Sequence, residues 1–144
     1  MKEKLIPKTK KQKTNFKNVE LSDIEKIVSI EADCHISPWS KRNFLDSISA
    51  GNLFQVLKDD ELIIGYYIAS FAADECELLN ITVKKHFHRQ GFGKIIISHL
   101  VKNCLVRKVS NFETFCRVEE QTGNSYKTLL ILLFELKKFS CLKT

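Results

Sequence analysis

The chain has 144 residues, 44% of them hydrophobic and ten of them Phe, which suits one domain with a packed core and excludes a fully disordered chain. Its net charge of +6 resides in residues 1–17, where seven Lys accompany one Glu, while residues 18–144 balance 16 basic with 16 acidic side chains. This balance excludes a basic globular face, so we expect a Lys-rich disordered tail over 1–17 and a folded domain over 18–144.

The five cysteines are an odd number without a CxxC pair, and no signal peptide precedes them, so we expect reduced thiols in a cytoplasmic protein. They lack metal-ligand spacing with the four His, and no metal site is expected. The longest apolar run, 129–134, is far shorter than the roughly 20 residues of a membrane span. We expect neither a membrane nor a DNA partner, and the sequence leaves the oligomeric state open.

Two helices are predicted in the first third of the chain. Ser22 and Glu25 have capping-box spacing, and apolar residues at helical intervals predict a helix over 23–32. Pro38-Trp39-Ser40 interrupts the pattern. Ser40 is suited to cap a second helix, which ends near Gly51.

Strand patterns follow, and then a third helix. Strands are predicted over 53–57, 62–72 and 77–83, with a bulge near Gly65. A charged loop over 84–88 leads to a helix ending near Leu105, whose expected apolar face is Ile95, Ile96, His99, Leu100 and Cys104. The order predicts a mixed α/β fold, an α+β sheet with an antiparallel meander at its centre.

The turn between the third strand and the third helix has the features of an anion site. Helix N-termini present unpaired backbone N–H groups and the positive end of the helix dipole. Gly91 and Gly93 let the backbone approach an anion, and Arg89 and Lys94 add positive charge on either side. The pattern suits a pyrophosphate.

The spacing argues against other phosphate motifs. It does not match G-x-x-x-x-G-K-[ST], and it lacks the third glycine of G-x-G-x-x-G. The plain alternative is a strand–helix turn with ordinary glycine punctuation.

Several segments resemble the GNAT superfamily of N-acetyltransferases. Asn80-Ile81-Thr82-Val83 and Arg89-Gln90-Gly91-Phe92-Gly93-Lys94 resemble its coenzyme A motif, and Pro38-Trp39-Ser40 and Phe44 resemble its helical region. The likeness runs from about Val19 to Leu105, in particular to members that acetylate an N-terminal alanine of a bacterial ribosomal protein. It implies a GNAT-like acyl-CoA N-acyltransferase fold with acetyl-CoA as co-substrate and a protein N-terminus, of a ribosomal protein, as acceptor.

The resemblance also implies residue roles. Backbone groups of Ile81, Thr82 and Val83 would pair with the pantetheine arm, and those from Arg89 to Lys94 would hold the pyrophosphate. Trp39 would shape the acceptor side, with a packing role as the alternative. His88 replaces the Gln or Arg usual at the first motif position; we weigh a solvated loop histidine against a catalytic base and favour the former.

The resemblance stops after about residue 107, and residues 108–144 diverge. Placed without gaps, the family's catalytic Glu and Tyr fall at Phe115 and Lys127. Acetyl transfer needs a base for the incoming ammonium and a proton donor for the leaving thiolate. Glu113, on the same strand face as the expected position, and Tyr126 are the best surviving candidates, with an exposed Glu and a packed Tyr as the alternative.

The abrupt loss of likeness suggests a reading-frame change between about Lys108 and Thr114, which would remove the family's last strands. The sequence thus leaves three hypotheses. The first is an active N-acetyltransferase, and the second is a coenzyme A-binding remnant without turnover. The third is a module that contacts RNA or the ribosome through the Lys-rich tail.

Overall fold

The computed structural model describes residues 13–114 of the chain. The elements follow in the order β1 (Thr14–Asn18), η1 (Leu21–Asp23), α1 (Ile24–Cys34), α2 (Lys41–Ser49), β2 (Leu53–Asp59), β3 (Leu62–Ala72), β4 (Glu75–Val83), η2 (Lys85–Phe87), α3 (Phe92–Val106) and β5 (Asn111–Thr114). The mixed α/β order and the central meander predicted from the sequence are confirmed.

The five strands form one sheet in the order β1-β2-β3-β4-β5. The pairs from β1 to β4 are antiparallel, whereas β5 runs parallel to β4. A parallel neighbour needs a crossover connection, and α3 supplies it. Leu57 pairs with Gly65 and Lys58 with Ile63, so β3 is bulged at Ile64–Gly65, as the sequence predicts.

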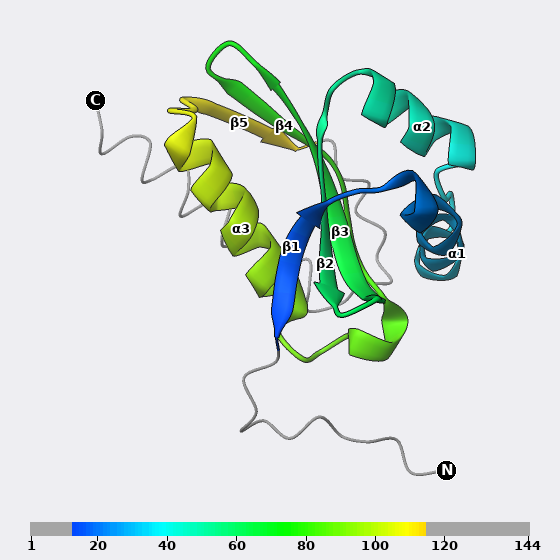
Figure 1. Cartoon of the computed structure of the whole chain (residues 1–144). Coiled ribbons are helices and arrows are strands. Elements are labelled where there is room, and N and C mark those ends of the chain that lie inside the picture. The colour runs from blue at the N-terminus through cyan, green and yellow to red at the C-terminus, as the bar shows by residue number, and fades with distance from the viewer. Residues whose placement is uncertain (1–12, 115–144) are drawn as a thin grey trace, which may run out of the picture.

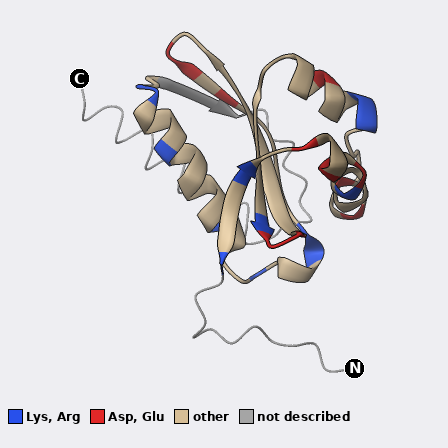
Figure 2. Cartoon of the chain, viewed as in Figure 1, with Lys and Arg blue, Asp and Glu red and all other residues tan. Residues whose placement is uncertain are grey.

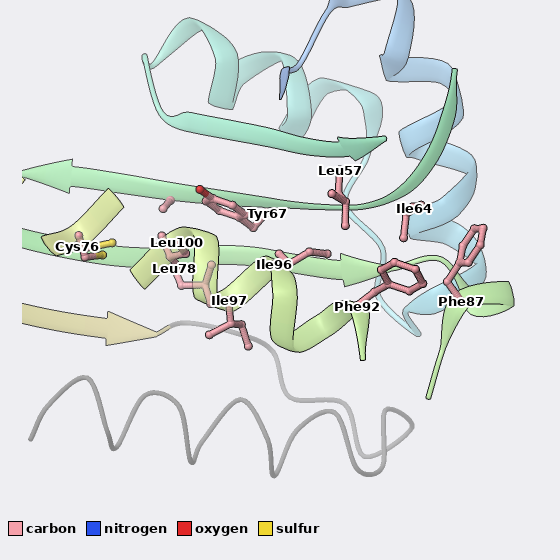
Figure 3. Close-up of a cluster of buried hydrophobic side chains, with 12 residues drawn as sticks. Leu57, Ile64, Tyr67, Cys76, Leu78, Phe87, Phe92, Ile96, Ile97 and Leu100 are labelled. Atoms are coloured by element: carbon pink, nitrogen blue, oxygen red, sulfur yellow. The ribbon is translucent and has the colours of Figure 1, made fainter. Parts of the chain in front are cut away.

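Helices cover both faces of the sheet, with α3 on one side and α1 and α2 on the other (Figure 1). Alternate residues of β3 serve the two faces: Tyr66 and Ile68 pack toward α1 and α2, while Tyr67 and Ala69 pack toward α3. Figure 3 shows the cluster on the α3 side. Residues 63–69 of the central strand β3 are therefore buried on both faces.

Gly65 allows α3 to lie close to the sheet. A Cβ at this position would stand 2.5 Å from the Thr82 carbonyl oxygen and 2.8 Å from Cδ1 of Ile96. Both approaches are closer than real side chains make, so only glycine fits. The position of α3, and of its first turn, depends on this contact.

The structure corrects three expectations about the chain. Residues 14–17 belong to β1, so the Lys-rich tail predicted over 1–17 extends too far. The strand residues Thr14-Asn15-Phe16 lie between lysines, which obscure the strand pattern. The first helical turn is tied by Asp23, which accepts the Glu20 backbone N–H at 2.9 Å, and not by a Ser22–Glu25 box. On α3, Ile97 is buried in place of Ile95, which is 44% exposed.

The second helix begins as the sequence predicts. The Ser40 hydroxyl accepts the Asn43 backbone N–H at 3.2 Å, and Asn43 Oδ1 accepts the Ser40 backbone N–H at 2.9 Å. In the part of the chain that the structure describes, no helix has the length and apolarity to cross a membrane.

Candidate functional site

Two buried phenylalanines anchor the connection between β4 and α3. Phe87 in η2 and Phe92 at the start of α3 are each 4% exposed, and their rings meet edge to face with centroids 5.6 Å apart. They lie together at one end of the core cluster (Figure 3). The residues between them are thus held at the surface from both sides.

The N-terminus of α3 is open. Gly91 caps the helix with φ at +87°, and a Cβ there would meet no atom within 4 Å. Among the hydrogen bonds of the described residues, none uses the backbone N–H of Phe92, Gly93 or Lys94 as a donor. Within the described residues these amides are therefore available to an anion, and the binding of one at this bend stays a prediction.

Side chains fix the loop that precedes the helix. The Nε2–H of His88 donates to the Val83 carbonyl at 2.6 Å, and Gln90 donates from Nε2 to the His86 carbonyl at 3.0 Å. His88 is therefore half-buried and bonded, which corrects the expectation of a solvated loop histidine. Arg89 lies between these anchors with φ at +62°, a conformation that a non-glycine residue seldom adopts.

Positive charge surrounds this bend. Lys84, Lys85, Arg89 and Lys94 all lie between the end of β4 and the first turn of α3, and no acidic residue lies among them. Figure 2 shows basic colouring on this connection. The helix dipole and these side chains favour a ligand with negative charge.

Among residues 13–114, the outer edge of β4 has a partner strand over its first half only. β5 pairs with β4 only from Glu75 to Leu78 among the described residues. Ile68 pairs with Asn80 but Ala69 with Leu78, so Leu79 bulges out of the ladder where this pairing ends.

The register separates the backbone groups of the three predicted pantetheine residues. The Lys84 N–H donates to the Ile64 carbonyl at 2.8 Å, and hydrogen-bonded pairs alternate along an antiparallel ladder. The backbone groups of Thr82 therefore face β3. Those of Ile81 and Val83 point to the other edge. The Val83 carbonyl there already accepts the His88 Nε2–H and a contact from Cys34 Sγ, so an extended ligand can pair with the backbone groups of Ile81 and the N–H of Val83.

Trp39 packs against α2. Its ring centroid lies 5.3 Å from that of Phe44, and its backbone N–H donates to Glu31 Oε2 at 2.9 Å. The packing alternative for this residue is thereby confirmed, while its role toward an acceptor stays a prediction.

Sequence reasoning missed a buried polar network on the α1 side of β4. Glu31, 2% exposed, accepts hydrogen bonds from Tyr66 Oη (2.7 Å) and Asn80 Nδ2 (3.1 Å). Thr82 Oγ1 lies 3.3 Å from Glu31 and 2.8 Å from His35 Nε2. The signal was present: Glu31 falls four residues after Ile27, on the buried stripe of the helix.

The predicted catalytic pair is only partly located. The backbone of Glu113 pairs with Glu77 in the β4–β5 ladder. Tyr126 lies outside the described residues. The roles of both residues stay predictions.

Comparison with protein families gives one match over most of the chain. The sequence model of the acetyltransferase (GNAT) family matches residues 24–124, which extends beyond the limit of about residue 107 inferred from the motifs. A [ribosomal protein bS18]-alanine N-acetyltransferase of Salmonella typhimurium is 30% identical over 88 residues, 61% of this chain and 60% of that protein. A putative enzyme of the same name from Bacillus subtilis is 27% identical over 96 residues, 65% of this chain and 64% of that protein. The chain thus spans about three-fifths of the length of these curated relatives.

Solved structures show the same fold. The ribosomal-protein-S18-alanine N-acetyltransferase from Escherichia coli superposes with a TM-score of 0.71 at 24% identity, over 85% of this chain and 76% of that chain. The PaiA N-acetyltransferase from Thermoplasma acidophilum, solved in complex with coenzyme A, superposes with a TM-score of 0.69 at 16% identity, over 82% of this chain and 87% of that chain. The arrangement of α3 against the meander is therefore an established fold.

Proposed function

We propose, from the premise that this chain belongs to the acetyltransferase (GNAT) family, that it moves an acetyl group from acetyl-CoA to the N-terminal amine of a protein. The single observation that carries this proposal is the presence of two backbone surfaces that have free groups among the described residues. One is the start of α3, where the amides of Phe92, Gly93 and Lys94 have no acceptor among the described residues. The other is the outer edge of β4, at the backbone groups of Ile81 and the N–H of Val83.

The start of α3 suits the diphosphate of acetyl-CoA. Free amides and the positive end of a 15-residue helix act on the same volume of solvent, in front of Gly91. Arg89 and Lys94 flank it with exposed positive side chains. Gln90 contributes by holding the loop through its bond to the His86 carbonyl.

The edge of β4 suits the pantetheine arm. This arm contains amides, and an extended chain can add to an unpaired strand edge through main-chain hydrogen bonds. Ile81 and Val83 turn their backbone groups to that edge, and the side chains of both pack toward α3. Thr82 would then contribute through its side chain on the opposite face, not through its backbone.

The acceptor is proposed from the relatives. Curated relatives that match this chain are named for acetylating the N-terminal alanine of ribosomal protein bS18. We therefore propose a ribosomal protein with N-terminal Ala as the substrate, entering beside Trp39 on the loop between α1 and α2. Glu113 and Tyr126 remain our candidates for proton transfer from the C-terminal part of the chain.

Calorimetry with acetyl-CoA and an acetylation assay on peptides with N-terminal Ala test the proposal together. We expect saturable binding of acetyl-CoA and an acetylated α-amine, identified by mass spectrometry of the peptide. Binding without acetylation would favour the coenzyme A-binding remnant, and absence of both would remove the enzyme proposal. The RNA or ribosome alternative needs a separate binding assay with and without residues 1–12.

A further inference from the structure

We propose that His35 is a catalytic base, whose Nδ1 takes a proton from the ammonium group of the acceptor before the acetyl group moves. The assignment rests on the proposed function and adds to it a residue outside the predicted Glu113–Tyr126 pair. The tautomer of the ring, the lack of a partner for Nδ1 among the described residues and the position of the ring beside β4 carry the argument.

The hydrogen bonds around Thr82 fix the tautomer. Asn80 turns Nδ2 toward Glu31, so the Asn80 atom that faces the Thr82 hydroxyl, at 2.9 Å, is the acceptor Oδ1. The single Thr82 hydroxyl proton goes to this oxygen or to Glu31 Oε1 at 3.3 Å. Thr82 Oγ1 then accepts its 2.8 Å hydrogen bond from the Nε2–H of His35.

Glu31 requires the same tautomer. Its Oε1 lies 3.4 Å from His35 Nε2, and a carboxylate oxygen would repel a ring lone pair at that distance. With its proton on Nε2, the neutral ring carries its lone pair on Nδ1.

Among the described residues, Nδ1 is the ring nitrogen of His35 that is left without a hydrogen bond. The side-chain contacts of His35 with the described residues all use Nε2. Each buried side-chain nitrogen or oxygen in the described range has a hydrogen-bond partner. Nδ1 has no partner in that range, and the His35 side chain is 14% exposed, so we take Nδ1 as the ring nitrogen that meets the acceptor.

The ring lies beside the proposed seat of the acetyl donor. His35 follows α1 and begins the loop toward Trp39, and it is bonded to the side chain of Thr82. The neighbours of Thr82 in β4 supply the proposed pairing groups, which are the backbone of Ile81 and the N–H of Val83. The proposed base and the proposed site of the acetyl donor thus both lie against the same end of β4.

The step balances as follows. The acceptor ammonium gives one proton to Nδ1 of His35, which becomes an imidazolium, and the neutral amine attacks the thioester carbonyl carbon. A C–N bond forms and the C–S bond breaks with its electron pair on sulfur. The second amine proton ends on sulfur as the coenzyme A thiol, and the imidazolium returns its proton to water.

Glu31 acts as a positioning residue for this base. Its carboxylate stabilises the imidazolium through Nε2, in the manner of a buried carboxylate behind a catalytic histidine. Tyr66 and Asn80 hold the carboxylate in place. The other titratable groups around this end of α1 are Asp33, Cys34, Tyr66 and Lys85.

The first test is independent of turnover. Nitrogen-15 NMR of the His35 ring in the whole chain should show the proton on Nε2. With coenzyme A present, a peptide with N-terminal Ala should shift the Nδ1 resonance, and the same peptide with an acetylated N-terminus should not. A proton on Nδ1, or equal responses to the two peptides, would overturn the assignment.

The second test is kinetic. His35→Gln keeps a donor toward Thr82 but removes the base, so kcat/KM for the peptide should fall about 100-fold. The acidic limb of the plot of kcat/KM against pH should flatten. The Kd for acetyl-CoA should not change. His99→Gln, on α3, is the matched histidine control and should keep the wild-type pH profile at and above pH 7. Glu31→Gln should lower kcat, because the carboxylate behind Nε2 is lost.

The outcomes separate the two proposals. An active wild-type chain whose His35→Gln variant retains kcat/KM and the acidic limb would refute the base and leave the proposed function standing. A wild-type chain that acetylates no peptide would refute the proposed function, and the NMR result would then decide the assignment of His35.

Discussion

The hydroxyl of Tyr66 donates a 2.7 Å hydrogen bond to Oε1 of Glu31, joining the centre of the sheet to α1. Both residues are buried, and burial together with the negative charge of Glu31 raises the pKa of Tyr66 well above its ordinary value, so the hydroxyl stays protonated. The helix that ends just before His35 is thus attached to the sheet by a charged hydrogen bond.

Tyr66→Phe tests this attachment. The ring still fills its site, but Glu31 loses a donor, and we expect the free energy of unfolding to fall by about 1.5–3 kcal/mol. Tyr67→Phe is the matched control on the opposite face, where the hydroxyl bonds to neutral His99 and Asn103, and should cost about 0.5–1.5 kcal/mol. Denaturant unfolding measures both; equal losses would contradict the charged character of the Glu31 bond.

The buried pair of Lys58 and Asp23 is a second test of stability. The two side chains are 7% and 6% exposed and lie 2.7 Å apart. Lys58→Met leaves an uncompensated buried carboxylate and should lower the free energy of unfolding by about 3–5 kcal/mol. Lys41→Met breaks the exposed pair with Glu25 and should cost less than about 1 kcal/mol. Similar midpoints in denaturant for the two variants would show that burial does not matter here.

His99 makes stability depend on pH. Burial lowers the pKa of His99, the charge of Lys102 acts in the same direction, and the ring is stacked on Phe16. Below the ordinary His pKa of about 6.5, the unfolded chain binds more protons at this residue than the folded chain. Stability is therefore complete above that pH and is lost as the pH falls through the folded value.

The measurement compares unfolding free energies at pH 7.5 and 5.5. We expect the native chain to lose stability on acidification and His99→Gln to lose less. An identical pH dependence in the variant would assign the effect to other groups.

Gly91→Ala tests the proposed diphosphate site against a matched glycine. Gly91 and Gly51 have φ values of +87° and +76°, and a Cβ at either meets nothing within 4 Å. Alanine at either position should cost about 1–2 kcal/mol of stability through backbone strain alone. Only Gly91→Ala places a methyl group in front of the α3 amides, so it should weaken acetyl-CoA binding about tenfold or more. Calorimetry that finds equal affinities of the two variants for acetyl-CoA would show that the diphosphate does not bind at the start of α3.

Local patterns predicted much of this fold. Ser40 with Asn43 defines a helix start through two reciprocal hydrogen bonds, and the boundaries of β3 follow from an apolar stretch ended by turns. The bend at Gly91 was predicted because positive φ and an open helix end leave a mark in the sequence itself. Such features depend on neighbours in the chain and need no tertiary information.

The features that were missed depend on contacts between distant residues. Phe16 forms a strand among lysines because β2 offers it a partner 41 residues later, at Leu57. No prediction was made for Glu31, because a carboxylate is seldom buried and its donors, Tyr66 and Asn80, lie on two distant strands. His88 is bonded because β4 ends with a free carbonyl at Val83. No pattern within a helix or a loop reports these partners.

The alternation of side chains along the last four residues of β4 couples two tasks. Asn80 and Thr82 face the carboxylate network, and Ile81 and Val83 face α3. Deleting one residue between the Leu79 bulge and Val83 would exchange these faces, sending apolar side chains to Glu31 and hydroxyl and amide groups into the aromatic core. This one deletion would remove both the proposed base network and the proposed docking edge. A change in one of them is therefore tied to a change in the other.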